Sequence, residues 1–258
     1  MSEHAATTSF FDKKRRPYLL RKLHSLSGVL PVGGFLCFHL WTNAKAMQGQ
    51  ARFDSAVAEI HHMPYLPVLE AGILLPLLFH ALYGVKLALE SKPNVKLYSY
   101  SRNWMYTLQR TTGLIAFAFI AYHLWELWAQ KQLGRLPAEQ FYGALCANMS
   151  STVKGVPIVA LVYLLGIAAS VFHFANGLWG FCFSWGITVS RRAQRGAAGV
   201  FGLVGLALFL LGVNTAIYFA TGSRIALPFA PASGPEKGSA RSCVDIPLTP
   251  TDPAPGAR

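Results

Sequence analysis

Long apolar segments alternate with short polar ones along most of this 258-residue chain. Five apolar segments reach the roughly 20 residues that an α-helix needs to cross a bilayer, and they cover residues 23–42, 66–89, 105–128, 156–183 and 198–220. The pattern predicts an all-α integral membrane protein with five transmembrane helices, the first four forming a bundle. We expect a basic arm over residues 1–22, a transmembrane domain over 23–220, and a disordered tail over 221–258, where Pro, Gly, Ser and Ala are prominent.

Composition and charge support a membrane protein and suggest its orientation. With 53% hydrophobic and 13% charged residues, the chain is too apolar for an ordinary soluble domain. The net charge of +12 does not indicate nucleic-acid binding, because the basic residues are distributed as in a membrane protein. Alternate polar regions, counted from the amino terminus, hold 14 of the 23 Lys and Arg residues. The positive-inside rule therefore predicts a cytoplasmic amino terminus and an outer carboxyl terminus.

The two outer polar connections carry different expectations. Residues 43–65 are predicted to form a short amphipathic surface helix that ends at Pro64, whereas residues 129–155 read as a polar loop. The four cysteines form no Cys-x-x-Cys pair, so an iron–sulfur cluster or zinc site within this chain is not expected. Cys146 and Cys243 would both face outside, and a disulfide between them stays open because no spacing rule favours it.

Four histidines lie inside four different apolar segments, where a polar ring is costly and needs a partner. His80 and His173 belong to one repeat, FHALYG at 79–84 and FHFANG at 172–177, while His39 and His123 each begin the sequence His-Leu-Trp. A single such histidine is more often a packing residue, but one in each of four spans, in two motif pairs, indicates ligands. Two neutral imidazoles on facing helices can complete the axial ligation of a haem iron.

Depth along the spans decides which histidines pair. His39 and His123 lie near the outer ends of their spans, and His80 and His173 lie nearer the middle. We therefore expect an outer haem held by His39 and His123, the outer pair, and an inner haem held by His80 and His173, the inner pair.

Glycines and polar side chains are expected around the inner haem. Gly84 and Gly177 each follow the histidine of their repeat by four positions and would leave a notch beside it. Gly28 would clear the inner porphyrin, whereas Gly113, ten residues before His123, is offset by about 80° and fits less well. The anionic propionates need donors at the cytoplasmic ends of the first and third spans, and the candidates are His24, Ser25, Ser27, Gln109 and Arg110.

Several stretches together resemble one known family. They are 21–39 (RKLHSLSGVLPVGGFLCFH), 75–84 (LPLLFHALYG), 98–113 (YSYSRNWMYTLQRTTG), 122–126 (YHLWE), 172–181 (FHFANGLWGF) and 185–190 (WGITVS). The chain, over about residues 15–220, is similar to the membrane-anchor cytochrome b subunit, of the single-chain di-haem type, of bacterial succinate:quinone oxidoreductases (succinate dehydrogenase and fumarate reductase). The resemblance implies that His39 and His123 bind the distal haem, and His80 and His173 the proximal one, with His24 and Ser25 near the proximal propionates.

The resemblance also implies a function. The chain would anchor a flavoprotein subunit and an iron–sulfur subunit to the cytoplasmic face of the bacterial cytoplasmic membrane. Its two b-type haems would pass electrons between the iron–sulfur subunit and a quinone in the bilayer, expected to be menaquinone. Because quinone reduction consumes protons, a carboxylate or a histidine is expected near the quinone. The first candidate is Glu70 and the second is Glu126, with Asn43 a weaker third.

Two other functions remain open at this point. The chain could be the di-haem cytochrome b subunit of another membrane oxidoreductase, such as a hydrogenase or a formate dehydrogenase. It could also be a haem-free anchor whose histidines serve only in packing and hydrogen bonding.

Overall fold

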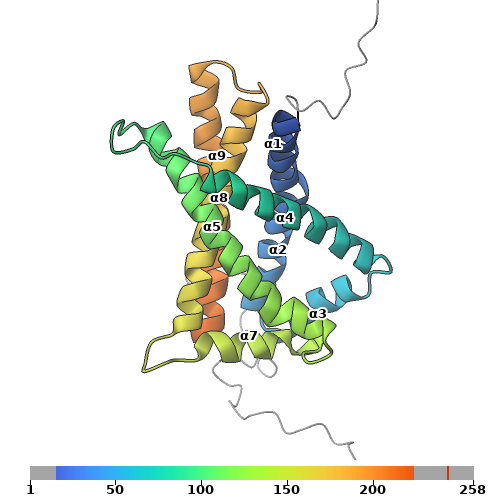
Figure 1. Ribbon diagram of the computed structural model, residues 1–258. Coiled ribbons are helices and arrows are strands. Elements are labelled where there is room, and N and C mark those ends of the chain that lie inside the picture. The colour runs from blue at the N-terminus through green and yellow to red at the C-terminus, as the bar shows by residue number, and fades with distance from the viewer. Residues whose placement is uncertain (1–15, 224–242, 244–258) are drawn as a thin grey trace, which may run out of the picture. The chain divides into compact units, whose positions relative to one another are not determined.

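The computed structural model describes residues 16–223 and Cys243, and every regular element in that part of the chain is helical (Figure 1). The α-helices are α1 (Arg16–Ser27), α2 (Gly33–Ala44), α3 (Gln50–His61), α4 (Leu66–Leu89), α5 (Ser101–His123), α6 (Gln130–Gln132), α7 (Phe141–Ser150), α8 (Ile158–Ser184) and α9 (Arg191–Thr221). Two π-helical turns, η1 (Gly28–Val32) and η3 (Leu124–Ala129), and two 3₁₀ turns, η2 (Lys45–Gln48) and η4 (Ala138–Gln140), complete the elements.

Five helical segments are long and apolar enough to cross a membrane, as the sequence predicts. They cover Arg16–Gln48, Leu66–Leu89, Ser101–Gln132, Ile158–Ser184 and Arg191–Thr221. The all-α, multi-pass fold is therefore confirmed, but several helices extend beyond their apolar stretches. The first begins at Arg16, so the end of the expected arm over residues 1–22 is helical, because Arg and Lys are good helix formers. Residues 1–15 and most of the expected tail lie outside the described residues.

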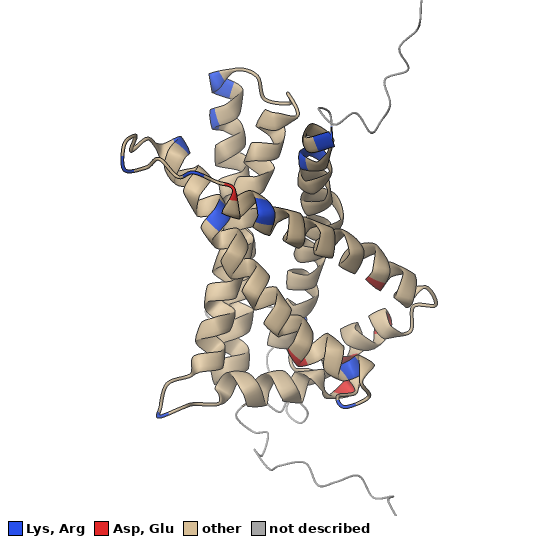
Figure 2. Cartoon of the chain, in the orientation of Figure 1, with Lys and Arg blue, Asp and Glu red and all other residues tan. Residues whose placement is uncertain are grey.

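The chain divides into two compact units. Among the described residues, unit 1 comprises 16–37, 67–117 and 169–206, and unit 2 comprises 38–66, 118–168, 207–223 and 243. Unit 1 contains eleven Lys and Arg residues against two acidic residues, whereas unit 2 contains five against four. Figure 2 shows the basic residues of unit 1 mainly at the starts of α1, α5 and α9 and at the end of α4.

Unit 2 has a core that the sequence analysis missed. The segment expected to be a polar loop contains α7, whose residues Tyr142, Cys146 and Met149 are almost completely buried. Phe53 of α3 packs against Tyr142 with ring centroids 5.7 Å apart and against Phe219 of α9 at 5.8 Å. The segment 43–65, predicted to be a surface helix, contains η2 followed by α3, although α3 ends at His61 and not at Pro64, and its buried face lies on this core.

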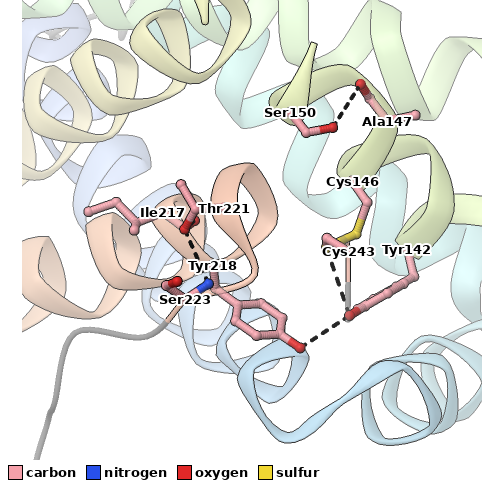
Figure 3. Close-up of a disulfide and its surroundings, with 9 residues drawn as sticks. All are labelled: Tyr142, Cys146, Ala147, Ser150, Ile217, Tyr218, Thr221, Ser223 and Cys243. Carbon is pink, nitrogen blue, oxygen red and sulfur yellow. Dashed lines mark hydrogen bonds between the residues drawn. A yellow bond between two sulfur atoms is a disulfide. The ribbon is translucent and has the colours of Figure 1, made fainter. Parts of the chain in front are cut away.

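A disulfide joins Cys146 of α7 to Cys243, across a sequence separation of 97 residues (Figure 3). The hydroxyl groups of Tyr142 and Tyr218 lie 3.3 Å apart beside it, and Cys243 is buried in the same core. The possibility left open by the sequence is therefore realised.

Two glycines of α9 permit close packing against other side chains. A Cβ on Gly205 would lie 2.8 Å from the Cβ of Ala175 in unit 1, and a Cβ on Gly212 would lie 2.8 Å from Ile167 in unit 2. A Cβ on Gly202 of the same helix would meet no described atom within 4 Å.

Candidate functional site

The inner pair lies in unit 1, where α4 and α8 bring its two rings together. The ring centroids of His80 and His173 are 6.1 Å apart, with an angle of 85° between the ring planes. Two metal–imidazole bonds of about 2.0–2.1 Å each, plus the radii of the two rings, amount to about 6 Å. The spacing therefore fits two imidazoles on opposite sides of one metal ion.

The hydrogen bonds of the inner pair fix which ring nitrogen can bind a metal. Nδ1 of His80 lies 2.8 Å from the backbone oxygen of His24, and Nδ1 of His173 lies 2.9 Å from the backbone oxygen of Gln109. Because a carbonyl oxygen only accepts, each Nδ1 carries the proton and donates it. Nε2 is then the unprotonated nitrogen of both rings, as a metal-binding histidine requires.

Glycines on the neighbouring helices make room for these rings. A Cβ on Gly28 would lie 2.7 Å from Nδ1 of His80, and a Cβ on Gly113 would lie 2.8 Å from Cε1 of His173, both closer than atoms can approach. Gly28 thus borders the ring of His80, and its expected role in clearing the inner porphyrin stays a prediction. Gly113 likewise borders the ring of His173, although residue counting ranked it as a poor fit. It lies on α5, facing α8, and not beside the histidine of its own helix.

The two repeat glycines face polar side chains of neighbouring helices. A Cβ on Gly84 would lie 3.1 Å from Nε2 of His24, and a Cβ on Gly177 would lie 3.4 Å from the side-chain nitrogen of Gln109. The structure therefore places the notch at Gly84 beside His24 and the notch at Gly177 beside Gln109.

Two of the expected propionate donors have buried atoms that lack a protein partner. The ring of His24 stacks on that of His80, with centroids 4.1 Å apart and planes 6° apart, and its Nε2 is buried without a hydrogen bond. Arg110 stacks on Tyr106, with its guanidinium carbon 3.2 Å from the ring centroid, and its Nε is likewise buried and unpaired. Such orphaned polar atoms are costly unless a bound group satisfies them. They fit an anionic ligand beside the inner pair.

The remaining three expected propionate donors form hydrogen bonds within the protein. Ser27 donates to the backbone oxygen of His24, the same atom that accepts from His80. Ser25 accepts a hydrogen bond from the indole nitrogen of Trp185. The side-chain amide of Gln109 donates to the backbone oxygen of His173 at 3.0 Å. These side chains fix the helices that carry the ligands.

The outer pair lies in unit 2, with ring centroids of His39 and His123 5.7 Å apart and planes 73° apart. This spacing is again compatible with two ligands on one metal ion. Asn43, one turn after His39, donates to its backbone oxygen at 2.8 Å, and the same amide nitrogen lies 3.4 Å from both ring nitrogens.

Two residues beside His123 were not found from the sequence. Its Nδ1 lies 3.1 Å from the hydroxyl oxygen of Tyr163, and this hydroxyl donates to Oε2 of Glu126 at 2.6 Å. Asn148 of α7 donates to Oε1 of Glu126 at 2.7 Å. A tyrosine inside an apolar span is a weak signal that its hydroxyl needs a partner, but the sequence does not say which one.

An aromatic ring packs against His123 on the same helix. Phe119 stacks with His123 at a centroid distance of 5.8 Å and a plane angle of 19°. Gly166 of α8 borders the Phe119 ring, because a Cβ there would come within 3.0 Å of that ring. A glycine from a neighbouring helix therefore makes room at both histidine pairs.

Glu70, the first quinone-site candidate, lies on α4, ten residues before His80, and is half-buried in unit 1. Ten residues of α-helix span about 15 Å. Within residues 16–223 and at 243, no group of three or more His, Cys, Asp or Glu side chains is placed to hold a metal ion. Each histidine pair thus offers two protein ligands, the number that a haem iron takes in addition to its macrocycle.

Comparison with known proteins decides the family. The model of the succinate dehydrogenase/fumarate reductase transmembrane subunit family matches residues 19–101 and 90–213. The chain belongs to this family. It is a membrane cytochrome b subunit, and it is 40% identical over 205 residues to the succinate dehydrogenase cytochrome b558 subunit of Bacillus subtilis (strain 168). The match covers 79% of this chain and 98% of that relative. This family assignment excludes the alternative that the chain is a hydrogenase or formate dehydrogenase cytochrome b subunit.

Proposed function

We propose that this subunit binds two b-type haems and transfers electrons between an iron–sulfur partner subunit and menaquinone in the bilayer. His80 and His173 would hold one haem, and His39 and His123 the other, each through a ring nitrogen. The spacing of each pair supports the assignment. The observation that carries it is that both ligands of the inner pair donate Nδ1–H to backbone oxygens of neighbouring helices, which leaves Nε2 for iron.

The protein's own contribution is to hold and bury these ligands. When bound, each haem supplies one reversible electron carrier. The stacking of His24 on His80 and the contacts of Gly28 and Gly113 restrict the rings to one orientation. The unpaired atoms of His24 and Arg110 are the proposed donors to the propionates of the inner haem.

For the quinone site, we propose Glu70 as the group that delivers or accepts the proton. A carboxylate within a membrane span is costly and indicates a functional role. Glu126 is the second candidate, but its hydrogen bonds to Tyr163 and Asn148 favour a fixed position over proton exchange. Glu70→Gln is expected to slow quinone reduction while both haems are retained.

The proposed orientation has the amino terminus in the cytoplasm and the carboxyl terminus outside the bacterial cytoplasmic membrane. The excess of basic residues in unit 1 supports it through the positive-inside rule. The disulfide between Cys146 and Cys243 supports this orientation independently. Disulfides persist in oxidising compartments, and the oxidising compartment at this membrane is the one outside the cytoplasm.

Unit 1 also offers a surface for the flavoprotein and iron–sulfur subunits. The connections between α4 and α5 and between α8 and α9 lie outside the spans, yet they expose apolar side chains. Leu97 and Val189 are each 82% exposed, and Tyr100 is 70% exposed. Exposed apolar residues outside the bilayer are typical of protein interfaces, and we propose that the iron–sulfur subunit covers these.

Haem content and single substitutions test the function. The purified complex should contain two b-type haems for each copy of this chain. His80→Ala and His173→Ala should remove one spectral component, and His39→Ala and His123→Ala the other. Loss of the same component in His39→Ala and His80→Ala would refute the pairing, and absence of any b-type haem would refute the proposed function.

A further inference from the structure

The two histidine pairs differ in the groups that accept their Nδ1 protons. In the inner pair both acceptors are neutral backbone oxygens, those of His24 and Gln109. In the outer pair, Nδ1 of His123 instead meets the hydroxyl of Tyr163, which is only 6% exposed. The acceptor for His123 is therefore a side-chain hydroxyl, and its strength as an acceptor depends on the group to which that hydroxyl donates its own proton.

The donor and acceptor capacities of these groups fix the direction of the hydrogen bonds that link His123, Tyr163 and Glu126. The Tyr163 hydroxyl has one proton, and its 2.6 Å contact with Oε2 of Glu126 has the length of a hydrogen bond to a charged acceptor. Its oxygen is then the acceptor for His123, whose Nδ1 must carry the proton. His123 therefore donates to Tyr163, and Tyr163 donates to the carboxylate of Glu126.

The carboxylate is held in place from two sides. Asn148 of α7 donates to Oε1 of Glu126 at 2.7 Å, so both carboxylate oxygens accept from a donor. Glu126 itself lies within the π-helical turn η3, which begins directly after His123. Irregular turns of this kind are frequent at functional sites.

We propose that Tyr163 and Glu126 are positioning residues that orient His123 and lower the reduction potential of the outer haem. This inference rests on the proposed function, since it requires a haem at His123. A carboxylate that draws on the Nδ1 proton makes the imidazole a stronger electron donor, and stronger donation stabilises oxidised iron. The inner pair, with neutral acceptors, lacks this effect.

The test is a spectroelectrochemical titration of the purified complex, with haem content measured on the same samples. Glu126→Gln keeps the size of the side chain and removes its charge, so the midpoint potential of the outer haem should become more positive while that of the inner haem stays unchanged. We expect the ratio of reduced to oxidised outer haem at a fixed potential to rise at least threefold. A tenfold rise corresponds to about 59 mV for one electron. Tyr163→Phe should shift the midpoint potential of the outer haem in the same direction. The double variant should shift it little further than either single variant.

Two matched controls separate this effect from a general disturbance of unit 2. Tyr218→Phe removes another buried tyrosine hydroxyl of that unit, and Glu139→Gln removes an exposed carboxylate. Neither should change either potential.

Each result decides between the alternatives. An unchanged outer potential in Glu126→Gln, or an equal shift of both haems, would overturn the proposal. If Tyr163→Phe does not retain the outer haem, Glu126→Gln alone decides; loss of the outer haem in both would show a purely structural role and also overturn it. A wild-type complex with fewer than two haems would instead refute the proposed function.

Discussion

Replacing Gly28 with alanine should remove the inner haem without unfolding the protein. A Cβ at this position would overlap Cε1 of His80 and lie 2.7 Å from Nδ1, whereas ordinary contact begins at 3.4 Å, so the ring must move by about 1.1 Å. A displacement directed away from His24 would lengthen the hydrogen bond to its backbone oxygen from 2.8 Å to about 3.9 Å, which is too long for such a bond. Loss of this bond costs about 1–3 kcal/mol if the buried N–H stays unpaired.

A second effect acts in the opposite direction. Alanine is favoured over glycine in a helix by about 0.5–1 kcal/mol, which offsets much of that cost for the fold as a whole. The position of His80, however, is not restored. We therefore expect Gly28→Ala to keep an apparent melting temperature close to that of the unchanged protein while its haem content falls from two towards one per chain.

The assay is haem content together with a reduced-minus-oxidised spectrum and a thermal melt in detergent. Gly34→Ala is the matched control, because Gly34 lies six residues further along the same span and no atom comes within 4 Å of its ideal Cβ position. It should retain both haems. Two haems with an unchanged spectrum in Gly28→Ala would show that the glycine is not required beside His80.

Three further predictions concern unit 2. Gly166→Ala should selectively lower the content of the outer haem, because the added carbon would displace Phe119, which stacks on His123; retention of both spectral components would contradict this. Cys243→Ser should abolish the difference in mobility between reduced and non-reduced samples on a denaturing gel and lower the melting temperature by a few degrees; no change in either would argue against the disulfide in the cell. Burial raises the pKa of Asp54 above its ordinary 3.8, so its ionisation opposes folding and stability should fall as the pH rises from 3.8 through the raised value. Asp54→Asn should flatten that dependence in melts recorded across this pH range, and an unaltered slope would assign it to another group.

The sequence predicted the five spans and the proximity of the two histidine pairs, because both depend on local patterns; that the pairs bind haem stays a prediction. Apolar length is enough to identify a span, and depth within the spans is enough to pair His39 with His123 and His80 with His173. The structure brings the members of each pair to about 6 Å from one another.

The helix α7 was overlooked although its pattern was present. Its buried residues Tyr142, Leu145, Cys146 and Met149 follow the i, i+3, i+4, i+7 spacing of an amphipathic helix. The flanking Gly and Pro residues and the length of the connection favoured a loop reading instead.

Other features could not be predicted because they depend on irregular or distant structure. Residue counting assumes 100° per residue, and the π-helical turn Gly28–Val32 breaks that phase between Gly28 and His39. The position of Gly113 was misjudged because the relevant ring, that of His173, comes from a different helix. The link from Glu126 to Tyr163 joins residues 37 positions apart, and only the packing of η3 against α8 brings them together.

The backbone acceptors of the inner pair have an evolutionary consequence. A carbonyl oxygen is supplied by every amino acid, so substitutions at His24 or Gln109 can change a side chain without removing the acceptor of His80 or His173. The hydrogen-bond acceptors of His80 and His173 are thereby protected from substitutions at these two positions. The acceptor of His123 has no such protection, because one nucleotide change can replace Tyr163. Within this family, adaptation to electron carriers of different potential should therefore accumulate around the outer pair.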